Sequence, residues 1–207
     1  MSEACCNPPP HSRDVSYRRI LWIALVANIA MFVIELAASL WSGSSALAAD
    51  AADFLGDSAN YALSLGALAL GGGWISRVAL LKGAAMALYG IGVLGYAGWR
   101  AWLGTPPEPF TMGAVGLLAL TVNFGVATLL YRFRAGDANM RSVWLCTRND
   151  VIANLAVVAA AAGVFGTGTV WPDVAVAVAL AMLGFTSGRL VVRQALQELN
   201  GAESASR

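Results

Sequence analysis

Six long apolar stretches constrain the fold of this chain more than any other feature. They cover roughly residues 20–41, 46–70, 79–103, 112–132, 143–166 and 173–191. A helix needs about 20 mostly apolar residues to cross a bilayer, and these stretches are of that length. They are continuous and lack the alternating pattern of membrane β-strands. The sequence therefore predicts an all-α, polytopic membrane protein, built as a six-transmembrane-helix bundle.

The composition excludes several other classes of protein. Charged residues make up 12% of the 207 residues, hydrophobic residues 58%, and the mean hydropathy is +0.65. Soluble domains carry about 25% charged residues, so the chain is too apolar for an ordinary soluble globule. The formal net charge of +1 excludes a strongly basic nucleic-acid binder. Three cysteines and one histidine exclude a disulfide scaffold and a His-rich catalytic centre.

The positive charges predict how the bundle lies in the membrane. Lys and Arg residues occur before the first stretch, between stretches two and three, between four and five, and after the sixth. The alternate loops, 42–45, 104–111 and 167–172, contain none. Because Lys and Arg accumulate in cytoplasmic loops, we expect both termini to be cytoplasmic. The expected organisation is a disordered cytoplasmic tail over 1–19, a transport domain over 20–191 and a short cytoplasmic tail over 192–207.

Several acidic residues lie inside the apolar stretches. Glu35 is in the first stretch, Asp50, Asp53 and Asp57 are in the second, and Asp150 is in the fifth. A charge at the bilayer centre costs about 2.5–3.5 kcal/mol even on the lenient insertion scale. The second helix should therefore be stable only against partner helices or a wet cavity. Acids at such positions are candidates for a functional site.

The spacing of these acids places them on helix faces. Asp53 and Asp57 are four residues apart, and Asp50 is three residues before Asp53, so all three lie on one face of a helix. Further polar residues continue this stripe: Asn60, Tyr61 and Ser64. The fifth stretch has a second stripe with a spacing of four: Cys146, Asp150 and Asn154.

The two stripes together supply a candidate metal site. Asp53, Asp57, Asp150 and Cys146 provide three carboxylates and a thiolate, which is a four-ligand set for a tetrahedral cation such as Zn²⁺. The thiolate favours Zn²⁺, Cd²⁺ or Co²⁺ over harder metals. Cys146 is equally compatible with a role as a small packing residue.

Other polar residues are expected to act around these ligands. Glu35, Asp50 and Asn154 are expected either to orient the ligands or to lie on a proton pathway. The N-terminal residues Cys5, Cys6 and His11 either capture metal at the entrance or belong to a plain disordered tail.

The sequence around these acids resembles that of the cation diffusion facilitator transporters. Residues 43–57 resemble the second-helix signature of this family, in which Ala-Asp leads to His or Asp, three residues and Asp. Glu35, with Asn28 before it, resembles the first helix of the zinc/cobalt/cadmium branch. Residues 141–154 resemble the fifth-helix signature, and Trp171-Pro172-Asp173 resembles the start of the sixth helix. The resemblance extends over about residues 18–199.

The resemblance implies a transport site and a way of moving. Its ligands fall on Asp53, Asp57 and Asp150, with Cys146 where the family usually has His or Asp. Helices one, two, four and five are implied to move against helices three and six. Most members have a soluble, dimerising cytoplasmic domain after the sixth helix, and this chain ends where that domain would begin. We therefore expect a homodimer held by membrane helices.

The resulting functional hypothesis is proton-coupled efflux of divalent metal cations, with Zn²⁺ preferred and Cd²⁺ or Co²⁺ possible. The expected partners are metal ions, protons and membrane lipid, without nucleic acid, a prosthetic group or enzymatic activity. The expected location is a bacterial inner membrane. Two alternatives are an intramembrane lipid or prenyl transferase with Asp motifs and a non-transporting, metal-sensing partner subunit.

Overall fold

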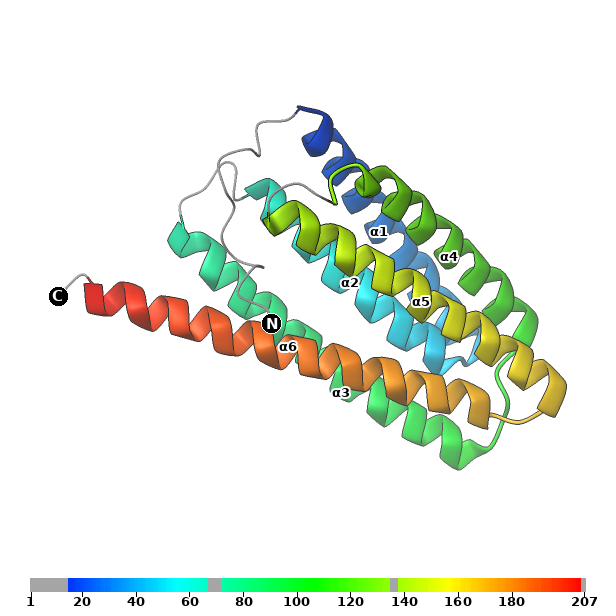
Figure 1. The fold of residues 1–207 in the computed structure, drawn as a ribbon. Coiled ribbons are helices and arrows are strands. Elements are labelled where there is room, and N and C mark those ends of the chain that lie inside the picture. Colours follow the sequence, from blue (N-terminus) through cyan, green and yellow to red (C-terminus); the bar gives the residue numbers. More distant parts are fainter. Residues whose placement is uncertain (1–14, 67–71, 135–137, 206–207) are drawn as a thin grey trace.

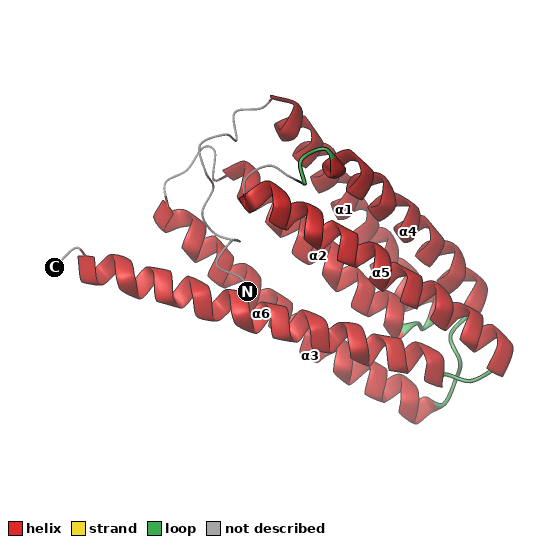
Figure 2. Ribbon diagram, in the orientation of Figure 1, coloured by secondary structure: helices red, strands yellow, loops and turns green. Residues whose placement is uncertain are grey.

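The computed structural model describes residues 15–66, 72–134 and 138–205, and these ranges contain helices and no strands (Figures 1 and 2). The helices are α1 (Val15–Ser42), α2 (Ser45–Gly66), α3 (Gly72–Leu103), α4 (Pro109–Tyr131), α5 (Ala138–Thr167) and α6 (Trp171–Ala205). The all-α prediction is confirmed, with one helix for each apolar stretch. Helices α1 and α6 extend into segments that the sequence predicted to be tails. Cys5, Cys6 and His11 lie outside the described residues.

Four of these helices are long and apolar enough to cross a membrane within the described part of the chain. They are α1, α4, residues 146–167 of α5 and residues 171–193 of α6. Helix α2 differs because it carries Asp50, Asp53 and Asp57 along its length. It therefore depends on its neighbours for a stable place in the bilayer. The orientation of the termini across the membrane stays a prediction.

The helices form two groups. Helices α3 and α6 lie side by side along one side of the bundle, and α1, α2, α4 and α5 form the other group (Figure 1). Gly83 and Gly188 allow the close approach of α3 and α6: a Cβ built on either would lie 3.0 Å from the carbonyl oxygen of the other. Small residues permit such contacts between membrane helices, where lipid supplies no hydrophobic drive for association. Gly184, four residues before Gly188 on α6, makes no such contact.

The three connections α1–α2, α3–α4 and α5–α6 meet at one end of the bundle, which we call the tied end (residues 42–45, 103–109 and 167–171). In each of these connections a glycine with positive φ follows the first helix: Gly43, Gly104 and Gly168. The Glu108 N–H donates to the Ser42 carbonyl at 2.9 Å, which joins two of the connections. The Glu108 carboxylate caps α4, accepting hydrogen bonds from the Phe110 and Thr111 N–H groups at 2.9 and 2.6 Å. Hydrogen bonds from Thr111 hold the pKa of Glu108 below its ordinary value.

A buried carboxylate connects α6 to the start of α2 at the tied end. Asp173 has no exposed surface. Its Oδ1 accepts from the Ser44 hydroxyl at 2.6 Å and the Ala46 N–H at 3.0 Å. Its Oδ2 accepts from the Ser45 hydroxyl at 2.6 Å and the Ser45 N–H at 2.8 Å. Asp173 thus caps the first turn of α2, where a negative charge also complements the helix dipole.

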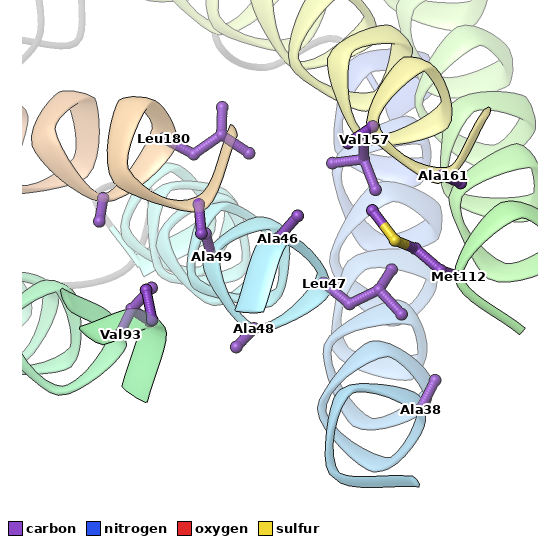
Figure 3. Packing of buried hydrophobic residues seen from close by; sticks show 14 residues of the cluster. Ala38, Ala46, Leu47, Ala48, Ala49, Val93, Met112, Val157, Ala161 and Leu180 are labelled. Atoms are coloured by element: carbon purple, nitrogen blue, oxygen red, sulfur yellow. The ribbon is translucent and has the colours of Figure 1, made fainter. Parts of the chain in front are cut away.

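Two features surround this connection. Apolar side chains from several helices pack against the first turns of α2, where Met112 of α4 and Val157 of α5 lie in one cluster with Leu47 (Figure 3). On the outside, Trp41 and Trp102 are 85% and 86% exposed. Exposed tryptophans near helix ends are typical of the membrane–water interface. The tied end therefore combines a packed interior with an aromatic outer surface.

The Asp173 connection makes a graded prediction about stability. Asp173→Ala should cause the largest loss, because each buried donor left without a partner costs about 1–3 kcal/mol. Asp173→Asn, which keeps one carbonyl acceptor, should cause a smaller loss, and Ser44→Ala the smallest. Thermal unfolding of the detergent-solubilised variants measures this order. Equal melting temperatures for Asp173→Ala and wild type would show that the connection does not stabilise the bundle.

Candidate metal site between α2 and α5

The polar stripes of α2 and α5 face each other along an antiparallel contact, which we call the α2–α5 seam (Asp50, Asp53, Asp57 and Tyr61 of α2; Cys146, Thr147, Asp150 and Asn154 of α5). Helix α2 runs away from the tied end and α5 runs towards it. Asp50 and Asn154 therefore pair near the tied end, whereas Tyr61 and Thr147 pair farther from it. The sequence predicted both stripes, and the structure brings them together.

The pair nearest the tied end is fully hydrogen-bonded. Asn154 has no exposed surface, and its Nδ2 donates to both oxygens of Asp50, at 2.9 and 2.7 Å. Asn123 of α4 donates from its own Nδ2 to Asn154 Oδ1 at 2.9 Å. This chain of hydrogen bonds joins α2, α5 and α4. The supporting role of Asp50 and Asn154, like the alternative of a proton pathway, stays a prediction.

Carboxyl groups dominate the middle of the seam. Asp57 is buried, whereas Asp53 and Asp150 are half-buried. Asp150 lies beside Asp57 and within electrostatic range of Asp53 and Cys146. One buried oxygen of Asp150, Oδ2, accepts no hydrogen bond from the described residues. Neighbouring carboxylates repel each other when both are charged, and a proton or a cation between them relieves the repulsion.

The pair farther from the tied end consists of hydroxyl groups. The Tyr61 hydroxyl lies 2.8 Å from Thr147 Oγ1 and 3.4 Å from Asp57 Oδ2. It is also within electrostatic range of Asp150 and Cys146. Tyr61 therefore lies directly against the candidate ligands, on the side away from the tied end.

Glu35 of α1 lies beside this seam. It has no exposed surface and is adjacent to Asp50, with Asp53 within electrostatic range. Its carboxyl group lies within hydrogen-bonding reach of the Asp50 carboxyl group, and no amide, hydroxyl or basic group of the described residues donates to it. Asn28, which is seven residues before Glu35 on the same helix, donates to the Ala24 carbonyl at 2.8 Å. The structure thus places Glu35 next to the acids of α2, while its role stays a prediction.

The four candidate ligands are neighbours, but they do not form one closed coordination sphere. Among the described residues, no three His, Cys, Asp or Glu side chains lie close enough together to hold a metal ion. Asp53, Asp57, Asp150 and Cys146 as a ligand set therefore stay a prediction. Arg148, which lies between Cys146 and Asp150 on α5, is exposed, and its guanidinium group lies over the Trp144 ring.

Two residues of the seam network were missed at the level of sequence. Asn123 is an amide in the middle of an apolar helix, and a polar residue in such a helix is a signal for contact with another helix. Thr147 gives a weaker signal, because threonines in membrane helices commonly bond only to their own backbone. Thr147 does so here, donating to the Val143 carbonyl at 3.1 Å.

The Asp50–Asn154 pair makes a prediction about stability. Asn154→Leu should lower the free energy of unfolding by about 1.5–3 kcal/mol, because hydrogen bonds to a charged group are lost. Asn123→Leu should cost less, since it removes a neutral hydrogen bond. The double variant Asp50→Leu/Asn154→Leu should recover much of the loss by removing the buried carboxylate as well. Unfolding in mixed micelles measures all three, and a double variant less stable than Asn154→Leu would contradict the prediction.

Comparison with known proteins identifies the family. A model of the cation efflux transmembrane domain matches residues 21–200. The chain is 28% identical over 185 residues to the metal cation efflux system protein CzcD of Cupriavidus metallidurans, covering 83% of this chain and 58% of that protein. It is 26% identical over 202 residues to a cadmium, cobalt and zinc/H⁺-K⁺ antiporter of Bacillus velezensis, covering 89% and 63%. The chain thus spans about three fifths of the length of these relatives. It belongs to the cation efflux family, the cation diffusion facilitators, and is a multi-pass membrane protein, as the motifs in its second and fifth helices implied.

Proposed function

We propose that the chain exports divalent metal cations across the membrane in exchange for protons, with Zn²⁺ as the preferred ion. The observation that carries the proposal is the pairing of Asp57 with Asp150 in the middle of the α2–α5 seam, with Asp53 and Cys146 close by. The names of the two relatives, an efflux protein and a cadmium, cobalt and zinc antiporter, support the same direction and class of ion.

The proposed coupling follows from the chemistry of the seam. Carboxyl groups in a low-dielectric environment favour their neutral, protonated form. A divalent cation needs deprotonated ligands, so its binding releases protons. Metal and protons therefore compete for the same groups. If the seam faces the two sides of the membrane in turn, this competition becomes exchange, and an inward proton gradient drives metal outward.

Several further features belong to the same proposal. We infer that both termini are cytoplasmic, that the protein resides in a bacterial plasma membrane, and that it forms a homodimer through its membrane helices. Glu35 and Asp50 are adjacent, which supports a route for protons that reaches the seam from α1.

The first test is metal uptake by proteoliposomes with an imposed pH gradient. The variants Asp53→Asn, Asp57→Asn and Asp150→Asn should each reduce uptake of Zn²⁺ to the level of protein-free liposomes. Each substitution removes the negative charge of a ligand and leaves the size of the side chain nearly unchanged. Glu108→Gln is the matched control, since Glu108 is exposed and far along the chain from the seam, and it should transport normally. Full transport by any two of the three variants would reject the site.

The same assay separates the alternatives. A metal-sensing partner would bind Zn²⁺ without transporting it. An intramembrane transferase would not take up Zn²⁺ in response to the pH gradient, so the variants would have no uptake to lose.

The second test concerns metal preference through Cys146, which is half-buried and within electrostatic range of Asp150. If its thiolate is a ligand, Cys146→Ser should weaken transport of Cd²⁺ about tenfold or more while changing Mn²⁺ little, because sulfur prefers softer ions. Cys146→His should restore Zn²⁺, for which imidazole is a good ligand. Competition between the ions in the uptake assay measures this. Indifference to both substitutions would show that Cys146 only packs.

A further inference from the structure

The Tyr61 hydroxyl occupies an unusual position among the candidate ligands. The side chain is 1% exposed, and its ring packs in a cluster with Leu21, Val126 and Leu130 from α1 and α4. Only the hydroxyl reaches the seam, where it lies 2.8 Å from Thr147 Oγ1 and 3.4 Å from Asp57 Oδ2. The distance to Asp57 is at the long end for an O–H···O bond, so the contact with Thr147 is the stronger of the two.

Counting hydrogen atoms shows that this network has two complete arrangements. Each hydroxyl can donate one hydrogen bond. In the first arrangement Thr147 donates to Tyr61, and Tyr61 donates to Asp57. In the second Tyr61 donates to Thr147, and Thr147 donates to the Val143 carbonyl, which lies 3.1 Å from its Oγ1. Both arrangements use the same positions of the heavy atoms, and both leave each hydroxyl with an acceptor.

We propose that Tyr61 and Thr147 form a two-position hydroxyl relay, which hydrogen-bonds Asp57 while the site is empty and releases this carboxylate when a divalent cation binds. The inference rests on the proposed function, because it takes Asp57 as a metal ligand. Tyr61 and Thr147 are positioning residues in this scheme and do not coordinate the ion.

The burial of both groups gives the relay its energetic value. A buried hydroxyl without an acceptor costs about 1–3 kcal/mol, and Thr147, like Tyr61, is almost completely buried. If Tyr61 had Asp57 as its only acceptor, a cation that takes the carboxylate would leave the tyrosine unpaired and would bear this cost. The second arrangement removes this cost, because Tyr61 then donates to Thr147 and Thr147 donates to the Val143 carbonyl. The relay therefore stabilises the empty site without weakening the filled one to the same extent.

The relay predicts opposite effects for two substitutions. Tyr61→Phe removes the hydrogen bond to Asp57 from the empty site, so Zn²⁺ should bind about three- to tenfold more tightly. Thr147→Val leaves Asp57 as the only acceptor for Tyr61, so Zn²⁺ should bind more weakly by a similar factor. In the Tyr61→Phe background Thr147→Val should have no effect, and Thr147→Ser should bind like the wild type. A purely structural role would shift both single variants in the same direction.

The measurement is calorimetric titration of Zn²⁺ alone into the full chain in detergent, at one fixed alkaline pH. Matched controls come from outside the seam: Tyr131→Phe and Thr128→Val, of which Thr128 makes the same type of backbone hydrogen bond, to Phe124. Both controls should bind like the wild type.

The possible outcomes distinguish the relay from the function on which it rests. Wild-type protein that binds no Zn²⁺ would overturn the proposed function and the relay with it. Wild-type binding together with unchanged or parallel shifts in the two single variants would overturn the relay alone. If Tyr61→Phe does not fold, Thr147→Val and Thr147→Ser decide the matter, since equal affinities for these two would reject the relay.

Discussion

The position of α2 depends on the Asp173 carboxylate. Helix α2 carries three aspartates, and it cannot be placed in a bilayer by its own hydrophobicity. Asp173 fixes its first turn with hydrogen bonds to two backbone N–H groups and two hydroxyls. Because this carboxylate belongs to α6, the helix that carries Asp50, Asp53 and Asp57 is anchored to the pair of helices that has none of the candidate ligands. By fixing the first turn of α2, this contact also fixes the positions from which the α2 residues of the seam follow.

Along the seam, the polar contacts divide into two kinds. At the two ends, Asp50 with Asn154 and Tyr61 with Thr147 are donor–acceptor pairs, which hold α2 and α5 together. Between them lie the carboxyl groups of Asp57 and Asp150, and Asp150 Oδ2 accepts no hydrogen bond from the described residues. An excess of acceptors in a low-dielectric environment is a costly arrangement that a cation would relieve. The unpaired oxygen of Asp150 is therefore an observation that supports the proposed cation site at the middle of the seam.

Much of this arrangement could be predicted from the sequence, for identifiable physical reasons. The apolar runs predicted the helices because a bilayer requires their length. The periodicity of a helix predicted the two polar faces, from the spacing of Asp50, Asp53 and Asp57 and from the spacing of four between the polar residues of the fifth helix. The sequence could not show which polar groups bond across helices. Asn123 contacts Asn154 because of how α4 packs on α5, and residue spacing within α4 carries no information about that. The cap by Asp173 joins positions 128 and 129 residues apart, and the motif Trp-Pro-Asp marked only the start of a helix.

The same cap also limits how the two groups of helices can move. The family resemblance implies that α1, α2, α4 and α5 move against α3 and α6. A sliding movement at the tied end would separate Asp173 from Ser44 and Ser45 and expose a buried carboxylate to an apolar interior, which is expensive. A rotation about the tied end leaves these hydrogen bonds intact and gives its largest displacement at the opposite end, where α1 begins and α6 ends. The Tyr61–Thr147 pair lies on that side of the candidate ligands, and Asp50–Asn154 lies on the anchored side. Because α2 and α5 belong to the same group, such a rotation carries the whole seam as one body, and the hydroxyl pair is displaced farther than Asp50 and Asn154.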